Sequence, residues 1–268
     1  SDKAIEEVAL DSPRFDEVIK RINPRPQPDR MLAYDGFYYE PGWLPLERTT
    51  KGKGWAGPWR LRSPDERTHR VETSPDSFEI VHGQLNVTWP VPGGRLGMLR
   101  LPAGGAYYVR PLENPIDLAR DGVTFFSLMV RETQRRADEQ PPREHLRLTF
   151  RSSADYFSDA VSFGHGPGYR PRIQAGRGNQ FNSPLILPTE QTTLWIGKIV
   201  SRAEGEDEVY FRVYGERDVL GYAEPATWHV VTRGVALDIR LDRVLLSSEG
   251  KTARIVDELR IVPTWRSV

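Results

Sequence analysis

Beyond residue 30 the sequence alternates apolar and polar residues in short runs, and the runs are separated by glycine, proline, asparagine or aspartate. The alternation is regular in residues 146–150 (LRLTF) and 209–214 (VYFRVY). Successive side chains of a β-strand point to opposite faces, so these runs predict strands with one buried face and one solvated face. Roughly a dozen such strands, with no repeat of fixed period, predict an all-β protein built as a two-sheet antiparallel β-sandwich.

The first 30 residues have a different pattern. Ser12-Pro13 offers an N-cap followed by a proline at the first helical position, and apolar residues then recur at helical spacing. Asn23-Pro24 ends this pattern, and the prolines that follow favour an extended segment. We therefore expect a short N-terminal helix and a Pro-rich linker over residues 1–30, and one β-sandwich domain over residues 31–268. The helix either packs across the sandwich or belongs to a neighbouring domain.

The charge balance and the lack of cysteine exclude several classes of function. The chain has 37 Lys and Arg against 37 Asp and Glu, so the sequence offers no electrostatic argument for binding nucleic acid or an anionic membrane. With no cysteine, it has no disulfide, thiolate metal site or cysteine nucleophile. No apolar run reaches the roughly 18–20 residues of a membrane span. The start, SDKAIEEVAL, does not read as a signal peptide, so we expect any export signal or membrane anchor to lie upstream of Ser1.

Two parts of the chain carry a resemblance to a known family. The first is residues 34–42 (YDGFYYEPG) followed by 52–59 (GKGWAGPW), and the second is residues 256–265 (VDELRIVPTW). Together they resemble the opening and closing strands of concanavalin A-like, LamG-type jelly-roll domains, and the similarity covers residues 31–268. In planctomycete-type bacteria such domains end surface proteins, including FecR-type sigma-regulator proteins. One departure is Pro263, near the point where members read Gly-Thr-Thr-Trp or similar; a proline is tolerated at a strand end.

The resemblance implies an exported bacterial module, periplasmic or extracellular, that binds polysaccharide or a surface protein. A second role that it implies is that of the sensing ectodomain of a membrane-anchored FecR-type regulator. In related sandwiches a structural Ca²⁺ often joins the first and last strands through oxygen ligands. Asp35 and Asp257 occupy the matching positions, which makes calcium the one cofactor that the sequence suggests. Alternatively, both carboxylates cap turns or pair with arginines such as Arg260.

Binding sites on sandwiches are usually built on long rim loops, and residues 164–184 read as a long irregular connection around one strand. A sugar site combines an aromatic ring, which stacks on C–H groups, with planar polar side chains that fix the hydroxyls. Trp55 and Trp59 either plug the core or expose one ring to a ligand. The candidate ligand-binding residues are Trp43, Trp55, Trp59, Tyr169, Arg170, Arg172, Arg177, Asn179 and Phe181.

The sequence offers no well-placed catalytic motif. A retaining glycosidase needs two carboxylates about 5–5.5 Å apart. Glu206 and Glu208 share a strand face but lie in a charged run typical of a solvated turn, and the adjacent Asp257 and Glu258 point to opposite faces. No two of the five histidines have metal-ligand spacing. We therefore expect a non-catalytic binding module. A glycosidase or lyase would need two carboxylates, or a Tyr/His/Arg cluster, brought onto one face from separate strands.

Overall fold

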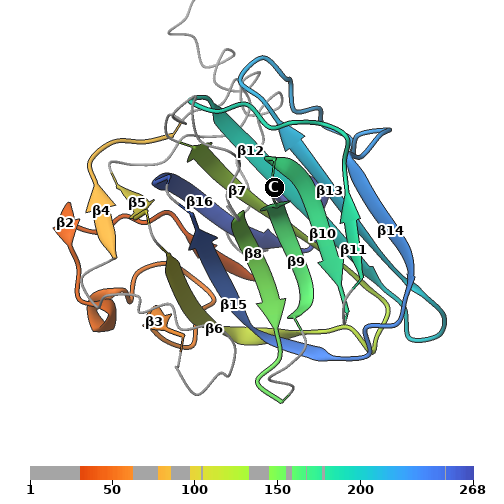
Figure 1. Ribbon diagram of the computed structural model, residues 1–268. Coiled ribbons are helices and arrows are strands. Elements are labelled where there is room, and N and C mark those ends of the chain that lie inside the picture. The colour runs from red at the N-terminus through yellow and green to blue at the C-terminus, as the bar shows by residue number, and fades with distance from the viewer. Residues whose placement is uncertain are drawn as a thin grey trace, which may run out of the picture.

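The computed structural model describes residues 31–62, 78–85, 97–103, 105–132, 145–154, 159–166, 168–176, 179–250 and 252–268. Within these ranges the chain forms two antiparallel β-sheets that lie one against the other, as Figure 1 shows. The predicted all-β, two-sheet sandwich is thereby confirmed. The helix and linker predicted for residues 1–30 lie outside the described residues.

One sheet has nine strands among the described residues, and the first and last strands of the sandwich meet in it. Strand β16 is bordered on one edge by β7 and on the other by both β5 and β1. The register pairs Ala33 with Ile261 and Asp35 with Leu259, which confirms the predicted meeting of the opening and closing segments. The spatial order is β14 (Val230–Val235), β13 (Asp207–Tyr214), β12 (Thr192–Ser201), β7 (Gly122–Glu132), β16 (Arg254–Val262), β5 (Met98–Leu101), β4 (Glu79–Val81) and β2 (Gly42–Trp43), with β1 (Ala33–Asp35) beside β16.

The other sheet has seven strands in the described part of the chain. Its order is β11 (Gln180–Asn182), β10 (Arg170–Ala175), β9 (Asp159–Gly166), β8 (His145–Arg151), β15 (Arg240–Glu249), β6 (Ala106–Asp117) and β3 (Arg60–Leu61). Strands β8 to β11 form a meander, so the prediction of a long irregular connection over residues 164–184 is wrong. The chain turns tightly instead, because Gly168, Tyr169 and Gly176 adopt left-handed backbone angles with φ of 77°, 55° and 65°.

Helical structure in the described ranges is confined to short 3₁₀ turns. These are η2 (Leu46–Arg48) and η4 (Trp265–Ser267). No helix in those ranges has the length and apolar character needed to cross a membrane.

The core between the sheets is dense in aromatic rings. Phe126 of β7 lies 4.6 Å from Phe163 of β9 between ring centroids, which places the two sheets in direct contact. Opposite Phe126 on β12 stands Gly197, where a Cβ atom would come within 1.9 Å of the Phe126 ring. The absence of a side chain at residue 197 is therefore what admits this ring.

The outer faces of the two sheets differ in character. On the nine-stranded sheet, the side chains that alternate with the core residues form a second apolar cluster. Its buried members are Leu85, Met98, Phe125, Met129, Leu194, Ile196, Tyr214, Val262 and Val268, and Trp228 and Trp265 pack against it. On the seven-stranded sheet Leu146, Leu148 and Phe150 face the core, so the residues that alternate with them on β8 face outward. That outer face is polar.

Candidate functional site

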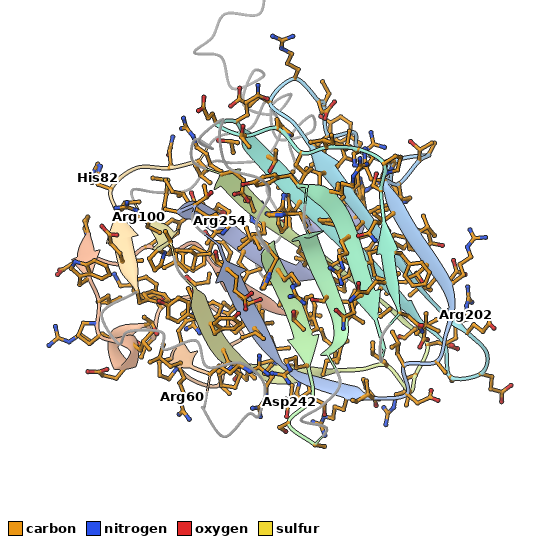
Figure 2. The ribbon with its side chains drawn as sticks, viewed as in Figure 1. Arg60, His82, Arg100, Arg202, Asp242 and Arg254 are labelled. Carbon is orange, nitrogen blue, oxygen red and sulfur yellow. The ribbon has the colours of Figure 1, made fainter. Side chains whose placement is uncertain are left out.

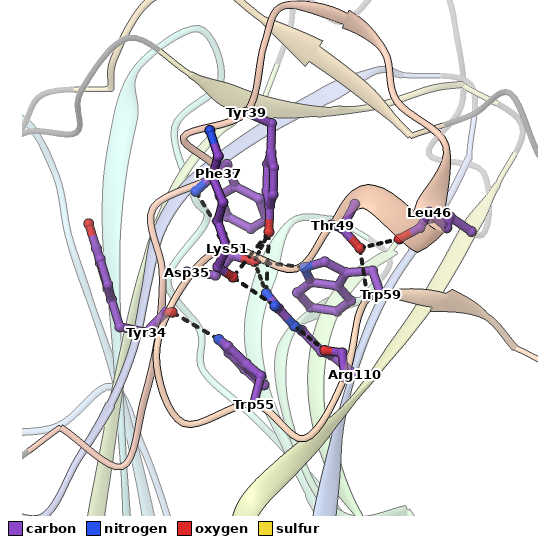
Figure 3. A network of polar contacts seen from close by, with 11 residues as sticks. Tyr34, Asp35, Phe37, Tyr39, Leu46, Thr49, Lys51, Trp55, Trp59 and Arg110 are labelled. Carbon is purple, nitrogen blue, oxygen red and sulfur yellow. Dashed lines mark hydrogen bonds and ion pairs between the residues drawn. The ribbon is translucent and has the colours of Figure 1, made fainter.

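An ion pair between Asp35 of β1 and Arg110 of β6 links the two sheets in the interior (Figure 3). Both side chains are 1% exposed. The Trp59 indole Nε1 donates to Asp35 Oδ2 at 2.8 Å, and the backbone N–H of Phe37 donates to Oδ1 at 2.8 Å. The Asp35 carboxylate thus has a cation and several hydrogen-bond donors around it.

The remaining donors of Arg110 hold the GKGWAGPW segment in place. Its Nε donates to the Gly57 carbonyl at 3.0 Å and its Nη2 to the Lys51 carbonyl at 2.7 Å. The guanidinium carbon lies 4.7 Å from the centroid of the Trp55 ring. Figure 3 draws both side chains. Trp59 is fully buried and Trp55 packs against the core. Of the two roles considered for these rings, filling the core and exposing one ring to a ligand, the structure favours the first.

Asp257 is buried where β16 bulges, at a step in its register with β7. Its Oδ2 accepts the backbone N–H of Leu85 at 3.1 Å and its Oδ1 that of Glu258 at 2.9 Å. Burial raises the pKa of Asp257 to about 7. Because Arg110 already stands against Asp35 and backbone donors occupy Asp257, the two carboxylates do not fit as ligands of one Ca²⁺ ion. Among the described residues no group of three or more His, Asp or Glu side chains could hold a metal ion.

Glu258 follows Asp257 in the bulge with a φ of 52°, which is strained for a residue with a side chain. The hydroxyls of Tyr34 and Tyr38 both donate to its Oε1, at 3.0 and 2.6 Å. Arg260 donates to its Oε2 at 2.5 Å. Arg260 therefore pairs with Glu258, and the Asp257-Glu258 dipeptide forms part of the strand junction rather than a pair of carboxylates facing a ligand.

The predicted aromatic ligand residues do not meet at one place. Trp43 is 59% exposed on the edge strand β2, whereas Tyr169 is 4% exposed, with its ring stacked on that of His165 at 5.1 Å. Phe181 points toward the core and packs against it. In Figure 1 strands β2 and β10 lie on opposite sides of the molecule.

The polar candidates have mixed positions. Asn179 lies in the turn after β10, where its backbone carbonyl accepts the N–H of Ala175 at 3.1 Å. Arg177 lies outside the described residues. Arg170 and Arg172, in contrast, alternate with Pro171 and Ile173 along β10, and they project from the outer face of the seven-stranded sheet.

On this outer face the strand register aligns polar residues in rows. One row crosses four strands through Asn182, Arg172, Gly164 and Arg147. The strands are about 4.8 Å apart, so Arg172 and Arg147 stand on either side of a glycine with roughly twice that distance between their backbones. The row contains no acidic residue.

The neighbouring rows add amides, hydroxyls and one histidine. Gln180, Gln174, Ser162 and Thr149 form the second row, in which Thr149 Oγ1 and Ser162 Oγ are 2.7 Å apart. The third row holds Arg170, Gly166, His145 and Glu249. Residues 162, 164 and 166 of β9 are a serine and two glycines, so the middle strand raises no long side chain between β8 and β10.

His145 sits at the end of β8 with its Nδ1 3.4 Å from Glu249 Oε2. Burial lowers the pKa of His145 to about 3, and electrostatic interactions, the largest of them with Arg147, add to this shift. The imidazole is therefore neutral at physiological pH.

Arg172 is half-buried, and its guanidinium packs over Gly166, where a Cβ atom would lie 3.0 Å from Nη1. Its Nε is buried without a hydrogen-bond partner, and no acidic side chain in the described part of the chain pairs with it. Burial, together with the nearby charge of Arg147, lowers the pKa of Arg172.

Sequence reasoning named Arg170 and Arg172 as ligand candidates but did not name the residues that lie beside them on this face. The missed residues that share the face are His145, Arg147, Gln174, Gln180, Asn182 and Glu249. A signal existed in residues 145–151 (HLRLTFR), whose polar members recur with the period of a strand. The register between β8, β9 and β10 was still needed to show that these residues meet those of β10.

The fold and this face define a two-sheet antiparallel sandwich with a polar, arginine-rich outer surface, an architecture shared with lectin-type jelly rolls. No family model matches the sequence, and a search of curated proteins finds no significant relative.

Solved structures with similar folds include lectins and a lyase. Endo-β-1,4-glucuronan lyase from the fungus Trichoderma reesei is 11% identical with a TM-score of 0.47, over 86% of this chain and 97% of that one. Peanut lectin is 8% identical with a TM-score of 0.40, over 72% and 94%. The Ca²⁺- and mannose-bound exoplasmic domain of VIP36 is 6% identical with a TM-score of 0.41, over 70% and 84%. All three TM-scores are below 0.5.

Proposed function

We propose that this domain is a carbohydrate-binding module whose ligand lies on the outer face of strands β8 to β11. The observation that carries the proposal is the alignment of amide and guanidinium side chains in register rows across these strands. Such planar groups offer several hydrogen-bond donors and acceptors in fixed directions, which suits the many hydroxyls of a sugar chain. Strands hold these groups more rigidly than loops would.

The face favours recognition by hydrogen bonds and charge over ring stacking. At the outward positions described on β8 to β11 there is no Trp, Tyr or Phe. A site for neutral sugars usually offers such a ring. The exposed Trp43 lies too far away, on β2, to take part.

We further propose that the role is binding without cleavage, in an extracytoplasmic bacterial setting. The support for the setting is the LamG-type resemblance alone. The same resemblance supports the alternative of a surface-protein partner, as in the ectodomain of a FecR-type regulator. Binding to a bacterial surface fraction whose glycans have been destroyed with periodate would favour the protein partner; loss of binding would favour the glycan.

Removal of single amides tests the binding face. We expect Gln174→Ala and Asn182→Ala each to weaken binding to an immobilised polysaccharide about fivefold, the value of one neutral hydrogen bond. Gln191→Ala is the matched control, because Gln191 is an exposed glutamine before β12 in the other sheet. The proposal is overturned if no member of a broad polysaccharide panel binds, or if the two face variants bind as well as the control.

A second candidate function is cleavage of an acidic polysaccharide by β-elimination. The favouring observation is that His145, 3.4 Å from Glu249, shares its face with Arg147 and Arg172. Its pKa of about 3 makes it a weak base, which is why binding without cleavage is the first candidate. The His145 Nε2 would take the proton from the sugar carbon next to a carboxylate. The C4–O4 bond would break as the C4=C5 double bond forms, and the imidazolium would return the proton to O4.

Ultraviolet absorbance separates the two functions. The binding proposal expects no product with a conjugated C4=C5 bond when the chain is incubated with polygalacturonate. Accumulation of such product that is lost in His145→Gln would replace binding with lyase activity.

A further inference from the structure

We propose that the ligand of this face is an anionic glycan, and that one of its carboxylate or sulfate groups binds between Arg147 and Arg172. The inference rests on the proposed function and adds the chemical class of the ligand. It follows from the distribution of charge, from the contrast between Arg172 and the interior arginines, and from the geometry around Gly164 and Gly166.

The charge of the face is strongly one-sided. The outward positions of β8 and β10 hold four arginines, Arg147, Arg151, Arg170 and Arg172, and no acidic residue. On the neighbouring strand β15, Arg243 is paired with Asp242 at 3.0 Å, and Glu249 lies 3.4 Å from His145. The chain as a whole is balanced, with 37 residues of each sign. Positive charge is thus gathered on this surface although the protein is neutral, and such a surface attracts anions.

Arg172 differs from the buried arginines of the interior in having no counter-ion among the described residues. Arg110 pairs with Asp35, Arg254 with Glu132 at 2.9 Å and Arg260 with Glu258 at 2.5 Å. Figure 2 shows Arg254 inside the sandwich, where its partner is also buried. Buried and half-buried charges are stable in proteins when a charge of opposite sign lies beside them. A ligand anion would give Arg172 the partner that the described chain does not supply.

The backbone prepares the space for this anion. Arg147 and Arg172 flank Gly164 in one register row, so no side chain rises between them. The Arg172 guanidinium rests over Gly166, which fixes its position before a ligand arrives. An arginine fork of this kind matches the planar carboxylate and can also donate to sulfate.

A glycan fits the face better than a nucleic acid does. Proteins that bind single strands stack the bases on aromatic rings, and the described outward positions of β8 to β11 carry none. The amides of Gln174, Gln180 and Asn182 beside the arginines suit hydroxyls that lie next to an acidic group.

The test uses polysaccharides in matched pairs on the intact chain. The pairs are polygalacturonate with its methyl ester, and dextran sulfate with dextran. We expect binding to at least one charged member and at least tenfold weaker binding to its neutral partner. Arg172→Gln should weaken binding to the charged member about 10- to 100-fold, the loss expected for hydrogen bonds to a charged group. The two pairs distinguish a carboxylate from a sulfate.

Arg202→Gln is the matched control, since Arg202 is exposed at the far margin of the other sheet (Figure 2). It should bind as the unchanged chain does. Arg172→Lys keeps the positive charge but loses the forked guanidinium. Its affinity for the charged polysaccharide should lie between that of Arg172→Gln and that of the unchanged chain. Thermal unfolding of each variant confirms that the face is intact.

The outcomes separate this inference from the proposed function. If the neutral polysaccharides bind as well as the charged ones and Gln174→Ala weakens their binding, the proposed carbohydrate binding stands and the inference of an anionic ligand is overturned. If neither pair nor any other glycan binds, both fail. Equal or tighter binding to polyuridylate or polyglutamate would assign the face to nucleic acid or acidic protein and also overturn the inference.

Discussion

Arg110 and Arg172 illustrate how the surroundings of a single residue decide its role. Both belong to the seven-stranded sheet, but Arg110 points into the core against Asp35, while Arg172 points outward with no acidic partner in the described chain. The first pair has to stay together, because either charge left alone in the interior is costly. The charge of Arg172 is tolerated at the surface without such a partner, and it remains available to a ligand anion.

Removal of the Asp35 charge should destabilise the fold strongly. In Asp35→Asn the guanidinium of Arg110 stays buried without a counter-ion, and we expect a loss of about 3–5 kcal/mol in the free energy of unfolding. Urea denaturation measures it. A loss below about 1 kcal/mol would show that water reaches Arg110 and that the ion pair does not brace the sheets.

In contrast to Asp35→Asn, Arg172→Gln should not destabilise the fold. Because Arg172 is crowded by the charge of Arg147, its neutralisation should leave the free energy of unfolding unchanged or raise it by less than about 1 kcal/mol. Weaker ligand binding together with equal or greater stability is the pattern of a residue kept for function.

Gly197 controls the packing of one aromatic ring. Gly197→Ala would place a methyl group within 1.9 Å of Phe126, and we expect a loss of about 1–3 kcal/mol from overpacking. Gly221→Ala is the control, since its nearest neighbour would be a carbonyl oxygen at 3.6 Å. Equal unfolding midpoints for the two variants would contradict the close contact of β12 with β7.

At the scale of elements, β16 joins the ends of the sandwich domain. Its first half pairs with β5 and its second half with β1, and the bulge at Asp257 and Glu258 separates the two halves. The bulge buries the Asp257 carboxyl, whose pKa rises to about 7. Stability at this junction should therefore depend on pH.

The expected pH dependence follows from the direction of the shift. The folded chain holds a proton on Asp257 that the unfolded chain releases near pH 4, so the contribution to stability is complete below about pH 4 and is lost as the pH rises through 7. Asp257→Asn should remove this decline, whatever its effect on the overall level of stability. Urea unfolding between pH 4 and 8 measures the slope; an unchanged slope would place the titrating group elsewhere.

On strand β8 the pKa of His145 is lowered, whereas that of Asp257 on β16 is raised. His145 has a pKa near 3 in the folded chain, whereas an unfolded histidine titrates near 6.5, so its contribution to stability is complete above about pH 6.5 and is lost as the pH falls toward 3. His145→Gln should make the domain more resistant to acid by up to about 1.4 kcal/mol per pH unit in this range. A variant that unfolds at the same pH as the unchanged chain would contradict the buried, neutral histidine.

At the scale of the whole molecule, the pKa shifts of Asp257 and His145 have opposite effects on how stability depends on pH. Between about pH 4 and 6.5 acidification stabilises through Asp257 and destabilises through His145, so the unchanged chain should have a flat stability profile there. The two single variants should tilt this profile in opposite directions. A steep profile in the unchanged chain would mean that other groups dominate its acid response.

The two outer faces also divide roles between the sheets. The nine-stranded sheet covers its outer face with apolar side chains and the C-terminal turn, while the seven-stranded sheet leaves a polar face with an excess of arginine. Ligand binding is therefore expected on one side of the molecule only. The residues of that side come from strands that follow one another in the chain, β8 to β11, so the meander itself assembles the candidate site.

The local pattern of the sequence was enough to predict the two-sheet fold, and the family resemblance of residues 34–42 and 256–265 predicted that the opening and closing segments meet, as β1 and β16 do. The period-two alternation is a property of each strand alone, so it can be read without knowledge of the partners. The same reasoning placed Arg170 and Arg172 among the ligand candidates. It failed for Tyr169 and Phe181, which lie beside them in the chain but turn toward the core.

What only the tertiary structure decided is which side chains face one another. Asp35 and Arg110 are 75 positions apart and meet across two sheets, so an acid that looked like a metal ligand is in fact half of an ion pair. Arg147 joins Arg172 because β8, β9 and β10 pair in one register, and a shift of one residue would have sent Arg147 to the core. Register depends on the packing of the whole core, and no local stretch of sequence contains that information.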